Sequence, residues 1–575
     1  MRKFMNIFAA ALIMLAAVSC EKNEVLPDNN SEGKIVTLKA SINNGGTKTS
    51  LGGEKGSDDK YPVLWSADDA IAVINNGKLF KFVLDAEDAG TTQGTFTCAE
   101  GDGFDETMSV QAFYPYEGVT YYAGAISYTV PATQAYATTV VNEVVCSTFG
   151  NGASPMAAYA DNAADGLSFE NLFGVLKLQL KGAENEKVFG VEIISDNSLK
   201  GNAQLTIGDA SNSISLTGTE SSDKKVILKC EEGVSLSPDT KTDFLVALPA
   251  NATNLKVLIH TNVGSYIKDI PVSNTNKIVA GQILLMPVLT LGEEDEDVNP
   301  IIYMENGVQL GNGIAIPNSD GTFTIWAPVN CGYDAVNFKY GKLYQWGRKY
   351  GQGYTTATYG ETEPEVVAGP VALEDGQNSD NANKFYKNTS SPYDWVSSPS
   401  DALWNSGSVD APVKTDYDPC PAGWRVPTSD EMKSLSSRFS TSNNNPGASE
   451  KNKENFDSEK GYYFYGVVTD EASAVNKVFF PAAGELLIDG TCGWIDYDDD
   501  VIPNRGYIGY YWTSTTNGTC SHSLMFGKIY DPYDEYEGGD WYYQLRIIDF
   551  TRRASGLSVR CVKDMTQSQP MPGSN

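Results

Sequence analysis

Three aspartates stand at alternate positions of the segment Asp496–Asp500, which is the spacing that opens a calcium-binding EF-hand loop. An EF-hand also needs a glycine at its sixth position for the sharp turn and a bidentate glutamate at its twelfth. Val501 and Tyr507 hold these two positions, so the sequence excludes an EF-hand. A looser calcium site within Gly493–Asn504 stays open, and its alternative is a solvated acidic loop.

The sequence contains two histidines, His260 and His522. His260 lies on the polar side of an alternating segment, which predicts a surface residue, and His522 lies alone in a serine-rich stretch. His-based triads, HExxH zinc motifs and phosphate-binding glycine loops do not occur in the sequence. No spacing singles out a carboxylate pair for glycoside hydrolysis among the 73 acidic residues. We therefore expect a protein that is not an enzyme and that carries no cofactor.

Nine cysteines allow sulfur chemistry, but no CxxC pair suggests a zinc site. Cys420 is held between two prolines, and Cys561 lies in a short alternating segment that predicts a strand at Leu557–Cys561. If these two cysteines pair, they close one large loop, which would stabilise the domain by roughly 4–5 kcal/mol. We favour Cys420–Cys561 as a disulfide, then Cys492–Cys520, and expect most other cysteines to be buried thiols.

Tyrosine and tryptophan gather in glycine- and aspartate-rich stretches between residues 494 and 543. Exposed rings of these types offer amphipathic contact area at low entropic cost, which suits glycans or protein epitopes. We hypothesise that Trp494, Asp496 and Tyr497 form part of a recognition surface. Packing in the core is the alternative role for any one of these aromatic residues.

A capped helix is predicted directly after the cysteine at 420. Thr428 and Glu431 have the spacing of a capping box, in which each side chain accepts a backbone N–H of the first turn. Met432, Leu435 and Phe439 follow at the spacing of one helix face. Trp424 offers the apolar surface that would anchor this segment in a core.

The stretch from residue 35 to 291 alternates between apolar and polar residues, as in Val36–Ile42, Phe80–Leu84, Leu176–Leu180 and Leu255–Ile259. Period two with one polar face predicts antiparallel sheets packed as sandwiches, and we expect no helix here. A change in texture near Lys181 predicts two lobes in tandem, at 35–181 and 182–291.

This stretch resembles the Bacteroidetes fimbrillin-like (Mfa-like) family. The matching motifs, in chain order, are Thr47–Ser50, Leu64–Val73, Phe113–Pro115, Pro131–Gln134, Pro155–Ala157 and Phe169–Leu178. The resemblance implies a two-lobed β-sandwich that serves as a pilus subunit or as a cell-surface adhesion scaffold. It also implies that proteolytic cleavage near Lys48 would release the first strand and open a groove for a neighbour's donor strand. The alternative is that Lys48 is only a turn lysine.

Residues 292–300 form an acidic run that ends in proline, which predicts a linker. The following residues, 301–564, resemble the Fibrobacter succinogenes major paralogous domain, whose organisation is similar to C-type lectin-like folds. The matching motifs are Trp326–Tyr333, Gly341–Lys349, Asp418–Thr428, Phe480–Gly484, Gly509–Ser514 and Arg553–Cys561. The resemblance implies an α+β domain closed by a first-to-last disulfide. Tyr511–Ser514 departs from the Trp-Asn-Asp that ligates calcium in C-type lectins, which puts calcium-dependent sugar binding in doubt.

The first residues carry the features of an exported lipoprotein. A basic start and an apolar run precede Ala17–Cys20, which resembles a bacterial lipobox. The resemblance implies a signal peptide at 1–19, lipidation of Cys20 and a flexible tether at 20–34. The alternative is an ordinary signal peptide with an incidental cysteine. No other run is long and apolar enough for a membrane helix, and residues 565–575 read as a disordered tail.

The formal charge of −31 excludes nucleic acid as a default partner, since phosphate binding needs a basic footprint. The sequence therefore predicts a mainly β protein, with two tandem fimbrillin-type β-sandwich lobes followed by an α+β C-type lectin-like domain. We expect a lipid-anchored protein of the outer membrane surface, acting as a fimbrial tip or accessory adhesin that binds a glycan or host protein. Other fimbrial subunits would join it by donor-strand exchange. The alternatives are a structural pilus subunit or anchor, and a glycan-capturing surface lipoprotein.

Overall fold

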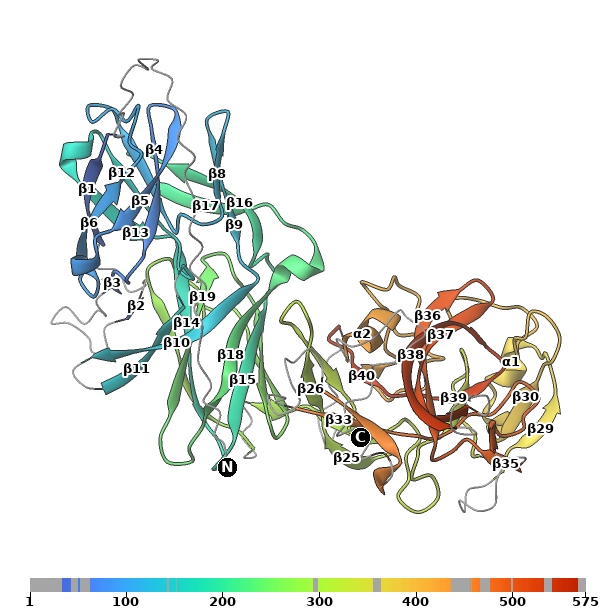
Figure 1. Cartoon of the computed structure of the whole chain (residues 1–575). Coiled ribbons are helices and arrows are strands. Elements are labelled where there is room, and N and C mark those ends of the chain that lie inside the picture. The colour runs from blue at the N-terminus through green and yellow to red at the C-terminus, as the bar shows by residue number, and fades with distance from the viewer. Residues whose placement is uncertain are drawn as a thin grey trace, which may run out of the picture.

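The computed structural model of the chain describes residues 34–42, 50–51, 63–141, 144–150, 152–292, 298–354, 363–435, 456, 458–465, 476–497, 500–531 and 540–566. These residues form a mainly β protein with three parts, which we name the barrel lobe, the middle lobe and the C-terminal lobe (Figure 1). The barrel lobe lies above the middle lobe in Figure 1, and the C-terminal lobe lies beside the middle lobe.

The barrel lobe contains a closed barrel, a four-stranded sheet and a short strand pair. In spatial order the barrel strands are β1 (Val36–Ile42), β13 (Leu167–Asn171), β12 (Met156–Ala160), β7 (Val110–Tyr114), β4 (Ala70–Asn75), β5 (Lys78–Leu84) and β6 (Gln93–Cys98). The sheet contains β17 (Asn212–Leu216), β16 (Gly201–Ile207), β9 (Ala125–Val130) and β8 (Val119–Tyr122), and the pair is β2 (Ser50–Leu51) with β3 (Val63–Leu64).

Alternating side chains fill the barrel, as the period-two pattern predicted. The inward residues of β1 are at most 4% exposed, and the residues between them face outward. Trp65 lies in the centre and meets the rings of Phe96 and Phe169 edge-on, with centroid distances of 4.9 and 5.6 Å. Edge-to-face packing is the arrangement that aromatic pairs favour. The core of this lobe is therefore built around one tryptophan.

The middle lobe is a sandwich of a seven-stranded and a three-stranded sheet around the largest apolar cluster of the described residues. The larger sheet contains β11 (Val144–Phe149), β10 (Thr133–Val141), β18 (Lys225–Ser235), β15 (Lys187–Ile194), β20 (Leu255–Thr261), β21 (Ser265–Ile270) and β23 (Asn299–Pro300). The smaller sheet contains β19 (Thr242–Pro249), β14 (Phe173–Lys181) and β22 (Ile283–Thr290).

The two lobes exchange strands, so the expected division at residues 181/182 does not separate two sheets. β10, β11 and β14 precede that position but belong to the middle lobe, whereas β16 and β17 follow it and pair with strands of the barrel lobe. β13 ends at Asn171 and β14 begins at Phe173, so the chain passes from one lobe to the other at Leu172. Alternation along a strand reports which face is buried but not which sheet the strand joins.

The expected linker at 292–300 is also partly a strand. Residues 293–297 lie outside the described part of the chain. Val298 is 1% exposed, and β23 pairs with β21 through Tyr266↔Pro300 and Ile267↔Asn299. The connection to the C-terminal lobe is therefore an edge strand of the middle lobe.

The C-terminal lobe contains two larger sheets and four strand pairs. The larger sheets are β26 (Ile314–Pro317), β27 (Phe323–Trp326), β40 (Val562–Lys563) and β31 (Trp424–Arg425), and β28 (Leu343–Gln345), β39 (Gly556–Ser558), β36 (Ile508–Asn517), β37 (Cys520–Asp531) and β38 (Asp540–Arg552). The pairs are β24 (Ile302–Glu305) with β25 (Val308–Asn312), β29 (Glu365–Ala368) with β30 (Lys384–Lys387), β32 (Gly461–Phe464) with β33 (Val478–Pro481), and β34 (Trp494–Tyr497) with β35 (Asp500–Pro503).

Helices of the described residues are short. The α-helices are α1 (Leu373–Gly376) and α2 (Ser429–Ser434), and the 3₁₀ helices include η1 (Ala86–Asp88), η2 (Ala163–Asp165), η3 (Ser221–Lys224) and η5 (Ser379–Asn381). The capping box predicted at the start of α2 is confirmed, with Thr428 and Glu431 each accepting a backbone N–H of the other. Met432 and Leu435 are fully buried, and Phe439 lies outside the described residues. The strand predicted at Leu557–Cys561 ends at Ser558.

The C-terminal lobe covers the outer face of the larger middle-lobe sheet. Leu258 of β20 belongs to the apolar core of the C-terminal lobe, in which Ile301, Tyr303 and Trp424 are buried. His260 lies on the same outer face and is 0% exposed, so the prediction of a surface histidine is wrong. Its ring lies 4.5 Å from the ring of Phe323 of β27. The polar side of this strand is buried because another lobe packs on it.

We name this contact the lobe joint. Phe323 packs over Gly190, where a Cβ atom would stand 2.6 Å from its ring. The joint is also hydrogen bonded: Ile301 donates its N–H to the Ser265 carbonyl at 2.7 Å, and the Asn476 side-chain amide donates to carbonyls on both sides of the joint. Packing and hydrogen bonds together fix the C-terminal lobe on the middle lobe.

Candidate functional site

The C-terminal lobe is closed by a disulfide between Cys420 and Cys561, whose Cα atoms lie 5.9 Å apart. Both cysteines are buried, 4% and 0% exposed, and they join segments that are 141 residues apart in the chain. Trp424 packs next to them, edge-on against Tyr303 with a centroid distance of 5.1 Å. The disulfide thus lies within the apolar core of this lobe and joins its middle to its last strands.

The expected pair Cys492–Cys520 does not form, and both residues are free cysteines. Cys492 forms an isolated backbone β-bridge with Leu486. In the same loop, Gly484 forms a backbone β-bridge with Gly509 at the beginning of β36. Cys520 instead faces Asn517 at the end of β36. At about 3.3 Å per residue, the length of this strand separates the two thiols. No local pattern around the two cysteines indicates that a long strand lies between them.

A third sulfur lies next to the disulfide. The Sγ atoms of Cys331, Cys420 and Cys561 are all within 4.8 Å of one another. The Tyr344 hydroxyl donates to Cys331 Sγ at 3.3 Å, and Cys331 donates to the Pro419 carbonyl at the same distance. Burial raises the pKa of the Cys331 thiol well above its usual value. The thiol is therefore held in its neutral, unreactive form.

A cleft of about 460 Å³ opens beside this cysteine cluster. We name it the Glu305 cleft, after the carboxylate in its wall. Three glycines, at positions 332, 351 and 353, line it, and its most prominent side chains are those of Glu305, Tyr333, Phe338, Lys342, Lys349 and Tyr350. Its volume lies within the range of small-molecule binding sites.

The wall of the cleft is fixed by the carboxylate of Glu305, at the turn of the β24–β25 hairpin. Both carboxylate oxygens accept the Gly332 N–H, at 2.8 and 3.0 Å, and the Tyr303 hydroxyl donates to one of them at 3.2 Å. Burial raises the pKa of Glu305 in spite of these hydrogen bonds. Gly332 has φ +73°, and a Cβ atom there would stand 2.7 Å from the Lys342 side chain. Only glycine fits this position.

The rim of the cleft presents aromatic rings. Tyr333, Phe338 and Tyr350 are half-buried and line the cleft. The Lys342 ammonium lies 4.8 Å above the centroid of the Phe338 ring, in cation–π geometry. Sequence reasoning missed this site because aromatic residues in a strand-rich chain usually form core. The available signal was the repetition of tyrosine among glycines between residues 333 and 354.

The predicted recognition residues lie on the β34–β35 hairpin. Trp494 is 52% exposed and pairs with Pro503. Asp496 pairs with Val501, and Tyr497 pairs with Asp500. The side chains of Asp496 and Tyr497 lie outside what the structure describes. The hairpin thus presents one tryptophan that is free to contact a ligand.

A partly buried carboxylate, Glu485, lies next to this hairpin. The Asn504 amide donates to Glu485 Oε1 at 3.4 Å, and the Tyr354 hydroxyl donates to Asn504 Oδ1 at 3.2 Å. Burial raises the pKa of Glu485 to about 7, although the hydrogen bond from Asn504 opposes it. A carboxyl with a pKa near neutrality changes its charge in the physiological range.

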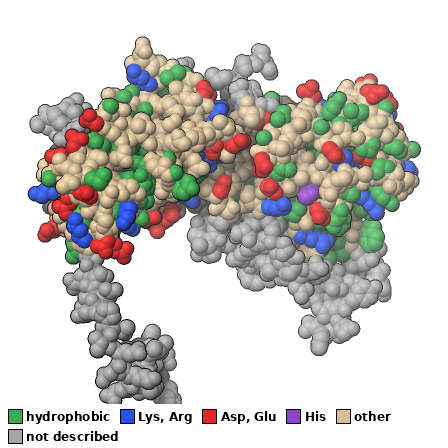
Figure 2. All heavy atoms as spheres, turned by 90° about the horizontal axis from the view of Figure 1, so that it is seen from above, with side chains coloured by type: hydrophobic (Ala, Val, Ile, Leu, Met, Phe, Trp, Pro, Cys, Tyr) green, Lys and Arg blue, Asp and Glu red, His purple; other side chains and the backbone are tan. Residues whose placement is uncertain are grey.

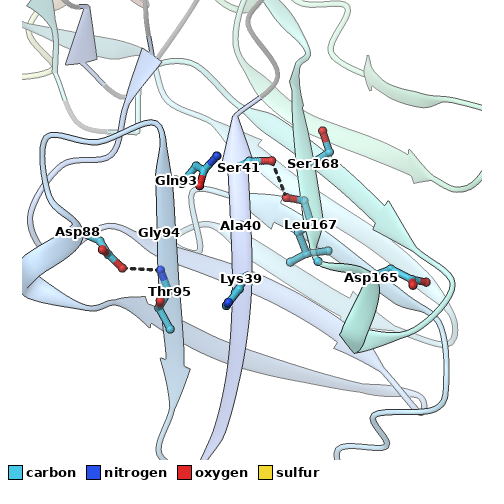
Figure 3. Close-up of a pocket in the computed structure, with 11 residues that line it drawn as sticks. Lys39, Ala40, Ser41, Asp88, Gln93, Gly94, Thr95, Asp165, Leu167 and Ser168 are labelled. Carbon is cyan, nitrogen blue, oxygen red and sulfur yellow. Dashed lines mark hydrogen bonds between the residues drawn. The ribbon is translucent and has the colours of Figure 1, made fainter.

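A second hollow, of about 430 Å³, lies beside β1 in the barrel lobe (Figure 3). Lys39, Asp88 and Asp165 line it, together with backbone of β1, β6 and β13. β1 pairs with β6 over Val36–Ser41 but with β13 only over Ala40–Ile42. The first strand is therefore bound closely on one side and loosely on the other. Cys20 and Lys48 lie outside the described residues.

Charge does not form one continuous patch on the face shown in Figure 2. Acidic side chains are spread over the left and right parts of this face, with lysines and arginines between them. Within the described part of the chain, no helix has the length and apolar character needed to cross a bilayer.

Comparison with known proteins gives similar solved structures but no matching family model and no matching curated protein. A candidate cell adhesion protein from Bacteroides ovatus is 13% identical, with a TM-score of 0.30, and the match covers 46% of this chain and 95% of that one. For a candidate cell adhesion protein from Bacteroides uniformis the values are 17%, 0.29, 48% and 97%. For the tip fimbrial protein Mfa3 from Porphyromonas gingivalis, in a form truncated at its C-terminus, they are 10%, 0.21, 46% and 96%. These TM-scores are too low to establish a common fold.

Proposed function

We propose that this chain is a non-enzymatic, lipid-anchored adhesin of the bacterial surface, with the C-terminal lobe as its binding head. One observation carries the proposal: the lobe with the Glu305 cleft and the exposed Trp494 is packed and hydrogen bonded onto a β-sheet body. This packing holds the binding lobe in a fixed position on its support.

The β24–β25 hairpin illustrates this arrangement. At its base, the Asn312 amide donates to the Val263 carbonyl of the middle lobe at 3.4 Å. At its turn, Glu305 and Asn306 line the cleft. One short hairpin therefore links the lobe joint to the wall of the cleft, which supports a ligand site held in a fixed position relative to the body.

The lipid anchor and the donor-strand exchange with other subunits are the parts of the proposal that rest on sequence. Lipidation of Cys20 would tether the chain to the outer membrane, and fimbrial subunits would be its protein partners. Cleavage after Lys48 would separate β1 from the barrel, because Lys48 follows β1 in the chain, and would open a groove between β6 and β13. Mass spectrometry of surface-shed protein tests this step. A mature N-terminus at Cys20 alone would exclude cleavage.

The adhesin function is tested with cells that produce the chain and with isogenic cells that lack it. Both are passed over immobilised glycan and matrix-protein arrays, and producing cells carrying Cys20→Ala serve as the anchor control. The proposal requires that only the unmodified producers are retained on at least one ligand, and that Cys20→Ala abolishes retention. Equal retention of all three strains would contradict it.

A further inference from the structure

We propose that the Glu305 cleft binds one or two neutral pyranose rings at the end of a saccharide. This inference rests on the adhesin function proposed above and names the ligand class and the residues. The recognition residues expected from sequence lie elsewhere, on the β34–β35 hairpin.

The lining suits a ligand with a polar edge and an apolar face. Tyr333, Phe338 and Tyr350 line the cleft and are half-buried, so each keeps accessible surface against which the C–H face of a pyranose can pack. Hydrogen-bonding groups for hydroxyls come from the Asn306 and Asn383 amides in the same lining. A purely apolar ligand would leave these polar groups without partners.

The charges of the lining favour a neutral ligand. Lys342 and Lys349 are offset by Glu305 and Asp334. Lys342 lies over the Phe338 ring, and the Asp334 carboxylate accepts the N–H groups of Val336 and Asn337. Both carboxylates therefore accept hydrogen bonds from backbone N–H groups of the protein. The two lysines of the lining are balanced by the same number of acidic residues. An anionic saccharide would meet no net positive charge here.

The cleft is preformed. Glu305 holds the loop at Gly332, and Asp334 and Phe338 exchange two backbone hydrogen bonds of 3.1 and 2.9 Å. The Asn330 amide closes the loop from the other end by donating to the Tyr340 carbonyl at 2.8 Å. A ligand that enters a fixed loop does not lose affinity to ordering it.

The test uses the full mature chain, residues 20–575, with lactose, maltose, cellobiose and diacetylchitobiose as probes in saturation-transfer NMR and calorimetry. We expect at least one disaccharide to bind, and Tyr350→Ala and Phe338→Ala each to weaken it about tenfold or more. Tyr350→Phe keeps the ring and should stay within about threefold of the unmodified protein. The matched control is Tyr122→Ala, which removes an 85% exposed tyrosine of the barrel lobe. Near-ultraviolet circular dichroism confirms that each variant is folded.

Absence of binding by all four disaccharides would overturn the inference, and so would binding that survives in folded Tyr350→Ala and Phe338→Ala. Loss of binding in Trp494→Ala, with both cleft variants unaffected, would move the site to the hairpin. The array experiment with whole cells distinguishes a failure of the adhesin function from a failure of the saccharide site alone. Retention of cells that is equal for the unmodified chain and the cleft variants would leave the adhesin function standing and remove this site from it.

Discussion

The backbone N–H of Phe323 donates a hydrogen bond of 3.1 Å to the carboxylate of Glu192, from the C-terminal lobe to the middle lobe. Glu192 is 3% exposed, and the same carboxylate accepts from Lys225 at 3.4 Å and lies 3.7 Å from the His260 ring. A buried carboxylate is costly unless it is paired and hydrogen bonded. Here the C-terminal lobe supplies one of the partners that make its burial tolerable.

The Phe323 ring should stabilise the contact between the two lobes more than it stabilises either lobe itself. We expect Phe323→Ala to weaken the lobe joint by about 1–3 kcal/mol, because the half-buried ring leaves a void over Gly190. Hydrogen exchange of the Ile301 and Phe323 amides, which both donate across the joint, measures the effect. Phe550→Ala, at a 70% exposed position, is the control. Unchanged exchange in Phe323→Ala would show that the ring does not hold the joint.

Glu192 should make stability depend on acid pH. Burial raises its pKa, but the charge of Lys225, the nearby His260 ring and the hydrogen bond from the Phe323 N–H outweigh burial and lower the pKa from 4.5 to about 2. A depressed pKa contributes stability above the unfolded value of 4.5, and this contribution is lost as the pH falls from about 4.5 to about 2. The contribution is on the order of 1–3 kcal/mol. Urea unfolding between pH 2 and 6 should be less pH-dependent in Glu192→Gln, and identical slopes would contradict this.

Glu485 should behave in the opposite way. Its folded pKa of about 7 lies above the ordinary 4.5, so its contribution is present below about pH 4.5 and is lost as the pH rises through 7. We expect Glu485→Gln to stabilise the protein by about 1–3 kcal/mol at pH 8 and to change little at pH 4. Thermal unfolding at both pH values measures the difference, with the exposed Glu374→Gln as control. An equal effect of Glu485→Gln at both pH values would rule out titration as its cause.

The Cys420–Cys561 disulfide should contribute more to the free energy of unfolding than any of the free cysteines does. We expect the double variant Cys420→Ser/Cys561→Ser to lose roughly 4–5 kcal/mol of unfolding free energy, in line with the long loop that the bond closes. Both cysteines must be replaced, since Cys331 lies within 4.8 Å of each and could pair with the one that remains. Cys492→Ser and Cys520→Ser should each stay within about 1 kcal/mol of the unmodified protein. A comparable loss in either single variant would contradict the assignment of these thiols.

Local sequence patterns predicted local structure. The alternation at Val36–Ile42 predicted β1, and the Thr428–Glu431 capping box predicted the start of α2. Each depends on residues a few positions apart, whose spacing directly encodes the geometry. The pairing of Cys420 with Cys561 in the structure agrees with the pair favoured from sequence.

Relations between distant elements were not predicted. The burial of His260 depends on Phe323, which belongs to another lobe, and the strand exchange at Leu172 depends on which sheet β14 joins. The Glu305 cleft combines the turn of one hairpin with a loop that begins at Gly332 and with segments near Tyr350 and Asn383. No periodicity within one segment carries this information, because the contacts arise only when the sheets are assembled.

The most direct test is to locate the ligand contact on a chain that comprises residues 20–575. A glycan or matrix protein that retains the producing cells on the arrays is added to the purified protein. Hydroxyl-radical footprinting then compares side-chain protection with and without this ligand. We expect protection within the described residues of 301–566, with Tyr333, Phe338 and Tyr350 among the protected side chains. Protection confined to residues 34–292 would contradict a binding head in the C-terminal lobe. Failure of every array ligand to retain the producing cells would contradict the adhesin function.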